Sequence, residues 1–385
     1  MPAPQLQKML GDLIATPSVS STASALDMSN EVVIDLIADW AEAAGFSVRK
    51  LAVQGEPGKF NLIATLGKGS GGLVLAGHSD TVPYDEALWR HDPFQLTEVD
   101  GRYYGLGSSD MKSFLALALE AAREVDPTTL KRPLILLATA DEETSMSGAK
   151  ALAAQDLSHA RFAVIGEPTG LVPINQHKGM MMEAIIYRGQ SGHSSDPSLG
   201  NNALEGMYQL MGELLTFREQ LQHQHRNEAF KVPFPTLNLG HIHGGDNPNR
   251  ICGECELQID LRPLPGMTLA TLRQQLRELA RQVASERKLH CEFRELFAGI
   301  GAMQTERSAP IVQAAEALTG HSATTVAFGT EGPMLNALGI DTVILGPGDI
   351  AQAHQPDEFL ALERIPPTIA LLRQLIERFC QRERA

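Results

Sequence analysis

One stretch decides the predicted fold: Leu73-Val74-Leu75-Ala76-Gly77-His78-Ser79-Asp80-Thr81-Val82-Pro83. Its first four residues form a continuous apolar run, which is typical of a buried strand in a sheet. Gly77 ends the run, and Pro83 cannot continue a strand because it has no N–H to donate. His78 and Asp80 therefore stand where a strand passes into a loop. Two residues apart in extended chain, they point to the same side, which suits a metal-binding His with a carboxylate that orients its ring.

Short apolar runs and helical patterns alternate around this stretch. Strands are predicted over 46–53, 61–66, 72–76, 134–138 and 162–165, and helices over 6–14, 31–44 and 111–125. Strands that alternate with helices favour an α/β layer around a buried, parallel or mixed sheet.

The pattern changes near residue 177. Strands are predicted over 180–187, 236–241 and 255–262, with helices over 202–222 and 268–287. This β-α-β-β-α order resembles a small ferredoxin-like domain. The first pattern then resumes with a helix over 310–318, a strand over 342–345 and a helix over 366–380. We therefore expect a catalytic domain in two parts, 1–177 and 292–385, interrupted by an inserted domain over 178–291.

The overall composition excludes several classes of partner for this 385-residue chain. A net charge of −14 disfavours nucleic acid and anionic membranes, because both are bound by basic surfaces. No apolar run approaches the roughly 20 residues that a transmembrane helix needs, and residues 1–7 show no secretory signal. Four Cys are too few for a disulfide framework at this length. We expect a reduced, cytoplasmic protein.

Acidic residues occur where other predicted elements begin or end. Glu142 and Glu143 follow one predicted strand, Glu167 follows another, and Asp110 precedes a helix. Taken singly, Asp110 has the ordinary interpretation of a helix N-cap, and the Glu residues that of solvated turns. Together, carboxylates at the mouth of one sheet repel one another unless a cation neutralises them.

A second histidine, His354, returns from the far end of the chain in a polar loop after a glycine-rich segment. Alone it would be interpreted as structural. Two His side chains with several carboxylates instead indicate a two-metal hydrolytic site, because imidazole suits zinc and a carboxylate can bridge two cations.

Longer segments then match one known family. They are residues 75–78, 140–146, 189–197, 236–246, 249–252, 260–268 and 352–358. Together they resemble the zinc-dependent M20 family of peptidases and deacylases, which includes acetylornithine deacetylases, succinyl-diaminopimelate desuccinylases, aminoacylases and glutamate carboxypeptidases. The resemblance covers nearly the whole chain. It implies a mixed-sheet, zinc-exopeptidase-like catalytic domain and makes the ferredoxin-like insert a dimerisation domain.

The resemblance also implies roles for the site residues. One metal would be held by His78, Asp110 and Glu167, and the other by Asp110, Glu143 and His354. Asp110 would bridge two divalent cations, with Zn²⁺ expected and Co²⁺ able to substitute.

Two further roles concern proton transfer and the histidine ring. Glu142 would be the general base and then the acid, and Asp80 would hydrogen-bond His78 to fix its tautomer. A metal-activated water would then hydrolyse an N-acyl bond. The implied reaction converts N2-acetyl-L-ornithine into acetate and L-ornithine for arginine biosynthesis.

Recognition of the substrate and of the oxyanion draws on other residues. The resemblance implies a homodimer in which His193 reaches the partner's site and donates to the oxyanion. Asn249 and Arg250 match the position that binds the substrate carboxylate. Glu331 is the expected partner of the ornithine ammonium, with two rival acids, Asp246 and Asp85.

Two alternatives remain open from the sequence, and a third is disfavoured. A related N-acyl amino acid deacylase, such as a succinyl-diaminopimelate desuccinylase, would use the same site. A non-catalytic metal-binding paralogue would keep the ligands without a need for the base Glu142. A doubly wound nucleotide-binding enzyme is disfavoured, because no Gly-x-Gly-x-x-Gly motif opens a helix after an early strand.

Overall fold

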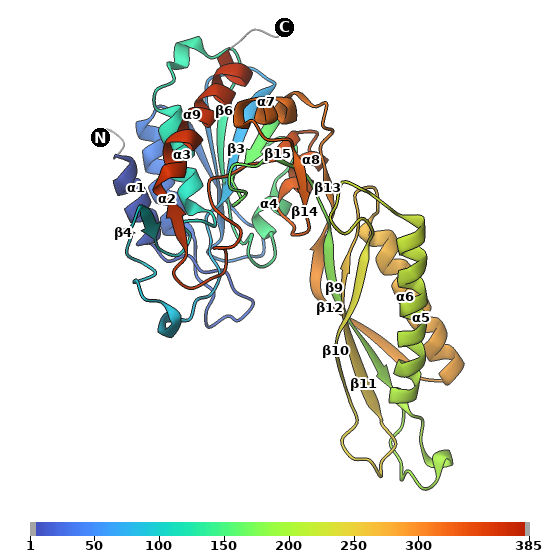
Figure 1. The fold of residues 1–385 in the computed structure, drawn as a ribbon. Coiled ribbons are helices and arrows are strands. Elements are labelled where there is room, and N and C mark those ends of the chain that lie inside the picture. The colour runs from blue at the N-terminus through green and yellow to red at the C-terminus, as the bar shows by residue number, and fades with distance from the viewer. Residues whose placement is uncertain (1–4, 382–385) are drawn as a thin grey trace. The chain divides into compact units, whose positions relative to one another are not determined.

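The chain divides into two compact units in the computed structural model, which describes residues 5–381. The first unit comprises residues 5–175, 305–324 and 330–381, and the second comprises 176–304 and 325–329. Residues 1–4 and 382–385, which were expected in the catalytic domain, lie outside the described part of the chain. The colours of Figure 1 follow residue number, so the interruption of the first unit by the second can be traced along the ribbon.

A mixed sheet forms the centre of the first unit. Its strands run in the order β1 (Ser47–Ala52), β2 (Phe60–Leu66), β6 (Leu134–Thr139), β3 (Gly72–His78), β7 (Ala160–Ile165), β15 (Asp341–Ile344) and β8 (Ile174–His177). β3 is parallel to both of its neighbours, whereas β2 is antiparallel to β1 and β6. Every residue of β3 and β6 is buried, which is why both strands have continuous apolar sequences. The predicted α/β class with a mixed sheet is confirmed.

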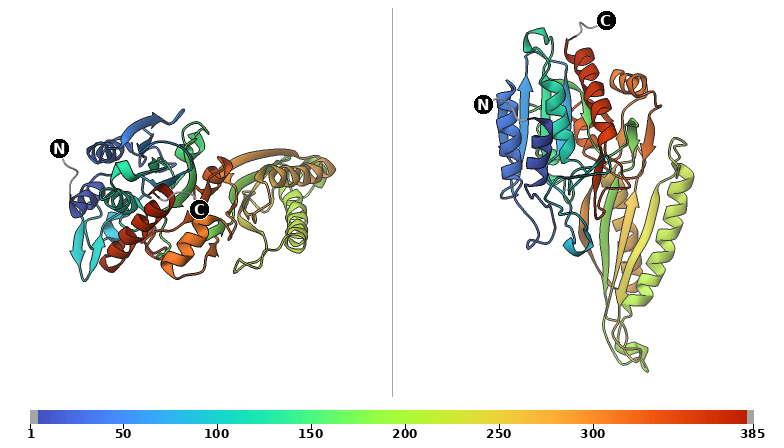
Figure 2. Two further views of the ribbon diagram at one scale, coloured as in Figure 1. Left: turned by 90° about the horizontal axis from the view of Figure 1, so that it is seen from above. Right: turned by 60° about the vertical axis from the view of Figure 1, so that its left-hand side comes forward.

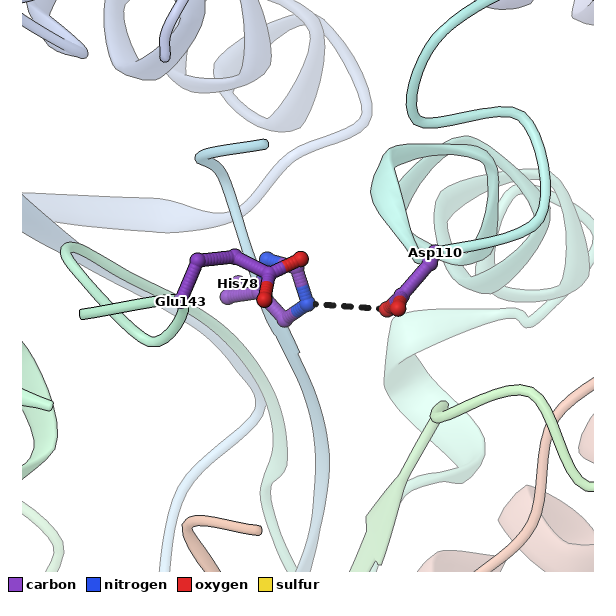
Figure 3. A group of neighbouring side chains, drawn as sticks. All are labelled: His78, Asp110 and Glu143. Atoms are coloured by element: carbon purple, nitrogen blue, oxygen red, sulfur yellow. Dashed lines mark hydrogen bonds and ion pairs between the residues drawn. The ribbon is translucent and has the colours of Figure 1, made fainter. Parts of the chain in front are cut away.

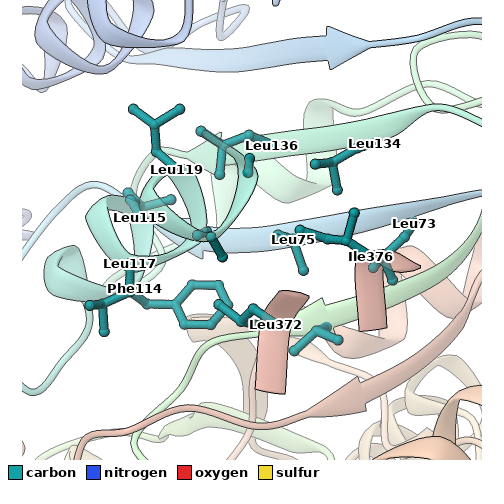
Figure 4. Packing of buried hydrophobic residues seen from close by; sticks show 14 of the residues in the cluster. Leu73, Leu75, Phe114, Leu115, Leu117, Leu119, Leu134, Leu136, Leu372 and Ile376 are labelled. Carbon is teal, nitrogen blue, oxygen red and sulfur yellow. The ribbon is translucent and has the colours of Figure 1, made fainter. Parts of the chain in front are cut away.

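The first unit also contains helices, several of which contact this sheet. They are α1 (Leu6–Ile14), α2 (Glu31–Ala43), α3 (Lys112–Ala122), α4 (Ser147–Ala151), α7 (Pro310–Thr319), α8 (Gly332–Ala337) and α9 (Ile365–Ile376). α3 contacts β3 and α9, and the two helices lie side by side in both views of Figure 2. Figure 4 shows Leu115 of α3 and Leu372 of α9 in one apolar cluster with Leu75 of β3. This core fixes the strand that ends in His78 and the helix that follows Asp110.

The first unit also contains a small antiparallel sheet of three short strands. They are β4 (Thr97–Val99), β5 (Arg102–Tyr104) and β16 (Phe359–Ala361), and β5 lies between the other two. β16 pairs with β5, so Phe359 lies opposite Tyr104. The sequence did not predict these strands, because three residues are too few to show a period. The pairing anchors the late segment of the chain, which carries His354, beside the loop that leads to Asp110.

The second unit is a sheet covered by two helices. Its elements are β9 (Met180–Arg188), α5 (Ala203–Gln224), β10 (Thr236–Gly244), β11 (Glu254–Arg262), α6 (Leu269–Arg287) and β12 (His290–Ile300). The strands run β10-β11-β9-β12, and all pairs are antiparallel. Apolar side chains of α5 and α6 form one buried cluster with those of the sheet. This β-α-β-β-α-β order is ferredoxin-like, as expected, with one strand more than the sequence predicted.

The end of the inserted unit differs from the expected position. The sequence placed it at residue 291, whereas the unit extends to 304 because β12 pairs with β9. β12 is an edge strand in which only Ile300 is buried, so it lacks the apolar run that marks a central strand. Among residues 5–381, no helix combines the length and the apolarity needed to cross a membrane.

Candidate metal centre

The predicted ligands of the first unit gather where the parallel strands end. His78 is the last residue of β3, and its register partner is Thr139, the last residue of β6. Glu142 and Glu143 lie in the turn that follows β6, and Glu167 follows β7. The carboxyl ends of parallel strands share one edge of a sheet, where ligands bind in open α/β folds. The fold therefore converts three separate strand ends into one site.

Distances within this site are short enough for shared ligation. His78 Nε2 lies 3.2 Å from Asp110 Oδ1, and His354 Nε2 lies 2.9 Å from Glu143 Oε2 and 3.6 Å from Asp110 Oδ2. Ligand atoms of His78, Asp110 and Glu143 all lie within 4.8 Å of one another. Figure 3 shows these three side chains pointing toward a common point. Within residues 5–381, one further group meets the same limit, His78 with Glu142 and Glu167.

Asp80 contacts a different partner from the one expected. His78 Nδ1 lies 3.0 Å from the backbone oxygen of Asp80, and 3.6 Å from its carboxylate. The carboxylate instead accepts the backbone N–H groups of Glu142, at 3.2 Å, and Glu143, at 3.1 Å. A carbonyl can only accept, so the neutral His78 ring carries its proton on Nδ1 and directs the Nε2 lone pair into the site. Asp80 thus fixes the tautomer through its backbone and the acidic turn through its side chain.

The electrostatics of the cluster are those of crowded like charges. Burial, reinforced by neighbouring carboxylates, raises the pKa of Glu142 and of Glu167 well above the usual value, and raises the pKa of Glu143. Burial alone would lower the pKa of His78, but its contact with Asp110 and the surrounding carboxylates raise it well above 6.5. A hydrogen bond to Glu143 raises the pKa of His354 to about 9.

Two buried carboxylate oxygens without hydrogen-bond partners among residues 5–381 indicate whether a cation would fit these residues. Glu143 Oε1 and Glu167 Oε1 are buried and have no hydrogen-bond partner in the described chain. A buried acceptor without a partner is costly, and a divalent cation would satisfy both oxygens while relieving the repulsion between carboxylates. Imidazole nitrogen with carboxylate oxygen is a donor set that suits zinc and its first-row neighbours. The residues therefore fit a divalent metal centre.

A buried ion pair that the sequence did not signal holds the acidic turn. Asp141 has a positive φ of 57°, and its carboxylate lies 2.7 Å from the Lys59 ammonium. Ser20 and Ser147 donate hydroxyl hydrogen bonds to the same carboxylate, at 2.9 and 3.1 Å. Asp141 is thereby neutralised away from the ligand atoms, while the next two residues face the site. Nothing in the local sequence of Lys59 could have identified this role.

Glu331 lies in the first unit and is 2% exposed. It accepts a hydrogen bond from Thr139 Oγ1 at 2.8 Å, and its other oxygen has no partner in the described residues. Burial raises the pKa of Glu331 to about 7. The rival Asp85 is exposed and lines a cavity of about 210 Å³ together with His354.

The remaining predicted residues meet in the second unit. The backbones of His193 and Arg250 form an isolated β-bridge, and Ser194 N donates to Asn249 O at 3.0 Å. All three predicted side chains are exposed. Arg250 lies 2.6 Å from Asp246, and both line a cavity of about 550 Å³ within this unit.

His193 has the opposite tautomer from His78. Ser195 N donates to His193 Nδ1 at 3.2 Å, so Nδ1 is an acceptor. In the neutral ring the proton is then on Nε2, which makes this exposed nitrogen a hydrogen-bond donor.

Comparison with known proteins gives consistent matches. Residues 74–378 match the family model described as peptidase family M20/M25/M40. The acetylornithine deacetylase of Edwardsiella ictaluri is 50% identical over 370 residues, which cover 96% of each chain. That of Proteus mirabilis is 48% identical over 382 residues, covering 99% of this chain and 98% of the relative.

Solved structures share the fold at much lower identity. Aminopeptidase PepT from Bacillus cereus has a TM-score of 0.76 at 19% identity, with 97% of this chain and 98% of that chain covered. The M20 metallo-carboxypeptidase Sso-CP2 from Sulfolobus solfataricus has a TM-score of 0.75 at 18% identity, with 98% and 99% covered. YXEP of Bacillus subtilis, described as a dinuclear metal-binding peptidase, has a TM-score of 0.66 at 15% identity, with 97% and 98% covered.

Proposed function

The chain belongs to peptidase family M20/M25/M40, and on that basis we propose that it hydrolyses N2-acetyl-L-ornithine to L-ornithine and acetate. The observation that carries this proposal is the identity of about half of all residues with two acetylornithine deacetylases over nearly the full chain. The cluster of His and carboxylate ligand atoms at the sheet edge supplies the chemistry that an amide hydrolase requires.

Two divalent cations, which we take to be Zn²⁺ with Co²⁺ as a substitute, would be held by the residues around Asp110. We assign His78 and Glu167 to one cation, Glu143 and His354 to the other, and Asp110 to both. When bound, the cations polarise a carbonyl oxygen and lower the pKa of water toward about 7.

Glu142 is the residue we assign to proton transfer. Its neighbour Glu143 hydrogen-bonds His354, whereas Glu142 is half-buried at the site and groups with His78 and Glu167. Burial and the negative charge of Glu167 raise the pKa of Glu142, which brings a carboxyl closer to the working range of a general base and acid. Glu142 would accept a proton from water and return it to the departing amine.

The second unit would complete the site from a partner subunit. His193 supports this role because its exposed Nε2 is a donor, which is what a developing oxyanion needs. An apolar stripe on α5 supports a homodimer through this unit. Leu204, Tyr208 and Leu215 share one helix face and are 45%, 78% and 37% exposed.

For the substrate we propose that Asn249 and Arg250 bind the carboxylate and that Glu331 meets the side-chain ammonium. The planar fork of Arg250 suits bidentate contact with a carboxylate. The unpartnered, buried oxygen of Glu331 favours it over Asp85, which already caps Ala87 N, and over Asp246, which pairs with Arg250. We also place the reaction in arginine biosynthesis in the cytoplasm, and four unpaired Cys support a reducing compartment.

A substrate panel tests the proposal. The protein as purified, the chelated protein and the protein reloaded with Zn²⁺ would be assayed with N2-acetylornithine, N2-acetylnorvaline and succinyl-diaminopimelate. We expect the highest kcat/KM with N2-acetylornithine, loss on chelation and recovery on reloading. Preference for succinyl-diaminopimelate would favour the related deacylase instead, and activity with none of them would favour a non-catalytic paralogue.

The panel also identifies the acid that binds the ammonium. Norvaline has the carbon chain of ornithine but no terminal amine, so only the cationic substrate should depend on that acid. We expect Glu331→Gln to lower kcat/KM for N2-acetylornithine more than for N2-acetylnorvaline. An equal loss for both substrates would remove Glu331 from this role, and a selective loss in Asp85→Asn or Asp246→Asn would assign it to that residue.

A further inference from the structure

The buried Glu358 carboxylate binds the loop that leads to Asp110. Oε1 accepts the backbone N–H groups of Ser109, at 2.6 Å, and Asp110, at 2.9 Å, while Oε2 accepts that of Gly107 at 3.0 Å. Glu358 is 1% exposed, and its own carbonyl accepts Gly105 N at 3.0 Å. Four backbone donors of one short loop are therefore bound by one residue that lies 248 positions after Asp110 in the chain.

The same short segment carries His354. Its backbone has a positive φ at His354, 59°, and at Asp357, 54°, which is unusual for residues other than Gly. Asp357 secures the segment on one side by accepting the backbone N–H groups of Arg90, at 2.9 Å, and His91, at 3.1 Å. Glu358 secures it on the other side, directly before β16. A strained loop with a proposed ligand is thus held at its end by two carboxylates with different partners.

Hydrogen-bonding capacity favours a carboxylate at position 358. All three donors that its side chain meets are N–H groups, and a carboxylate offers only acceptors. A Gln would place its NH₂ group against at least one of these N–H groups. Lys112, which follows the loop and is also buried, donates its Nζ hydrogen bond to Thr16 O at 2.8 Å, so it is not the hydrogen-bond partner that explains Glu358.

We propose that Glu358 is a positioning residue that couples the His354 segment to the Asp110 loop. It thereby holds His354 and Asp110, the proposed ligands of one metal, in the correct positions relative to each other. Both carboxylate oxygens of Glu358 accept backbone N–H groups, so we do not assign Glu358 as a metal ligand. Its effect would pass through the backbone N–H of Asp110, whose side chain would be shared by the two cations. The inference rests on the proposed two-metal function.

Metal titration of the full-length protein tests this inference. Chelated wild type and Glu358→Gln would be titrated calorimetrically with Zn²⁺, and Co²⁺-loaded samples would be compared by visible absorption, which reports the coordination at each site. We expect wild type to bind two Zn²⁺ and Glu358→Gln to bind one of them about 10–100-fold more weakly, as is usual when an outer partner of a ligand is lost.

Asp357→Asn is the matched control. Asp357 lies in the same segment and also accepts two backbone N–H groups, but from residues outside the ligand loop. Thermal unfolding of each chelated variant would report its loss of stability. We expect both variants to lose stability and Glu358→Gln to lose more metal affinity than Asp357→Asn, because only Glu358 also binds the Asp110 loop. Glu358→Asp, which keeps the charge one methylene short, should lie between wild type and Glu358→Gln.

The possible outcomes distinguish the positioning role of Glu358 from the proposed two-metal function. The positioning role would be overturned if Glu358→Gln bound both metals as tightly as wild type. It would also be overturned if Asp357→Asn lost as much metal affinity as Glu358→Gln. If wild type itself fails to bind two divalent cations, the proposed metal function fails instead. If Glu358→Gln does not fold, Glu358→Asp decides by the same titration.

Discussion

The imidazole of His354 lies 2.9 Å from the Glu143 carboxylate, although 211 positions separate the two residues in the chain. Glu143 follows the central strand β6, whereas His354 lies in a polar loop near the end of the chain, so only the tertiary fold makes them neighbours. The pair also touches Asp110, which His78 contacts from the other side. This chain of contacts joins all the proposed ligands except Glu167.

Removing the proposed base should separate catalysis from metal binding. Glu142→Gln keeps the size of the side chain and removes its ability to accept a proton. We expect kcat for N2-acetylornithine to fall by about 10²–10⁴-fold with both metals retained, since general acid–base catalysis is worth that much. Steady-state kinetics together with metal analysis would measure this. Undiminished kcat would refute the assigned role, and Glu363→Gln provides a surface control.

The His354–Glu143 pair should give the chelated protein a characteristic pH dependence. The pKa of His354 is raised to about 9 in the folded chain, above the value near 6.5 of an unfolded His. Stability from this pairing is therefore fully present below pH about 6.5 and is lost as pH rises through about 9. We expect Tm of the chelated wild type to fall over this range more than Tm of His354→Gln.

The affinity of the protein for metal should change with pH in the direction opposite to that of its Tm. A cation needs neutral His354, so apparent affinity for Zn²⁺ should rise with pH up to about 9 and release protons on binding. Calorimetry in buffers of different ionisation enthalpy would count those protons. His321→Gln, an exposed His in the same unit, serves as the control for both experiments. A pH-independent difference between wild type and His354→Gln would contradict the assignment.

Breaking the Lys59–Asp141 pair should destabilise the acidic turn. Lys59→Met leaves the Asp141 charge buried with only hydroxyl partners, and losing one partner of a buried pair costs about 3–5 kcal/mol. Lys59→Met with Asp141→Asn removes both charges, so we expect the double variant to recover part of that stability. Chemical denaturation of the chelated protein would measure both. Equal stability of Lys59→Met and wild type would show that the pair does not hold the turn.

Mixed dimers can show whether His193 acts across subunits. We expect His193→Ala to lower kcat by about 10²–10³-fold, the usual loss for one oxyanion donor. Glu142→Ala should be inactive for a different reason. Subunits of the two variants that have been unfolded and refolded together should regain activity, because one site then combines an intact Glu142 with the partner's His193.

A lack of recovery in the mixture, with mixed dimers present, would place His193 in its own subunit's site. Each variant refolded alone is the matched control and should stay inactive. Monomeric wild type in solution with full activity would exclude completion of the site by a partner.

Prediction from the sequence was most successful where burial imposes a simple pattern. β3 and β6 are buried at every position, so their apolar runs could be recognised, and the residues directly after them could be identified as site candidates. The three-residue strands gave no such pattern and were not predicted. Edge strand β12 gave none either, so the second unit ends at residue 304 instead of the expected 291. His354 was linked to the other ligands by its residue type and by the family resemblance, not by periodicity.

The sequence by itself determined the order of the longer buried elements, the α/β class and the residue types available for a metal site, because these depend on local patterning and on chemical identity. Tertiary structure decided which atoms meet. It gave the Asp80 carboxylate to the backbone of Glu142 and Glu143, paired Asp141 with Lys59, and brought Glu358 to the Asp110 loop. These contacts depend on buried polar groups finding partners far away in the chain, and such partners leave no period or spacing in the sequence.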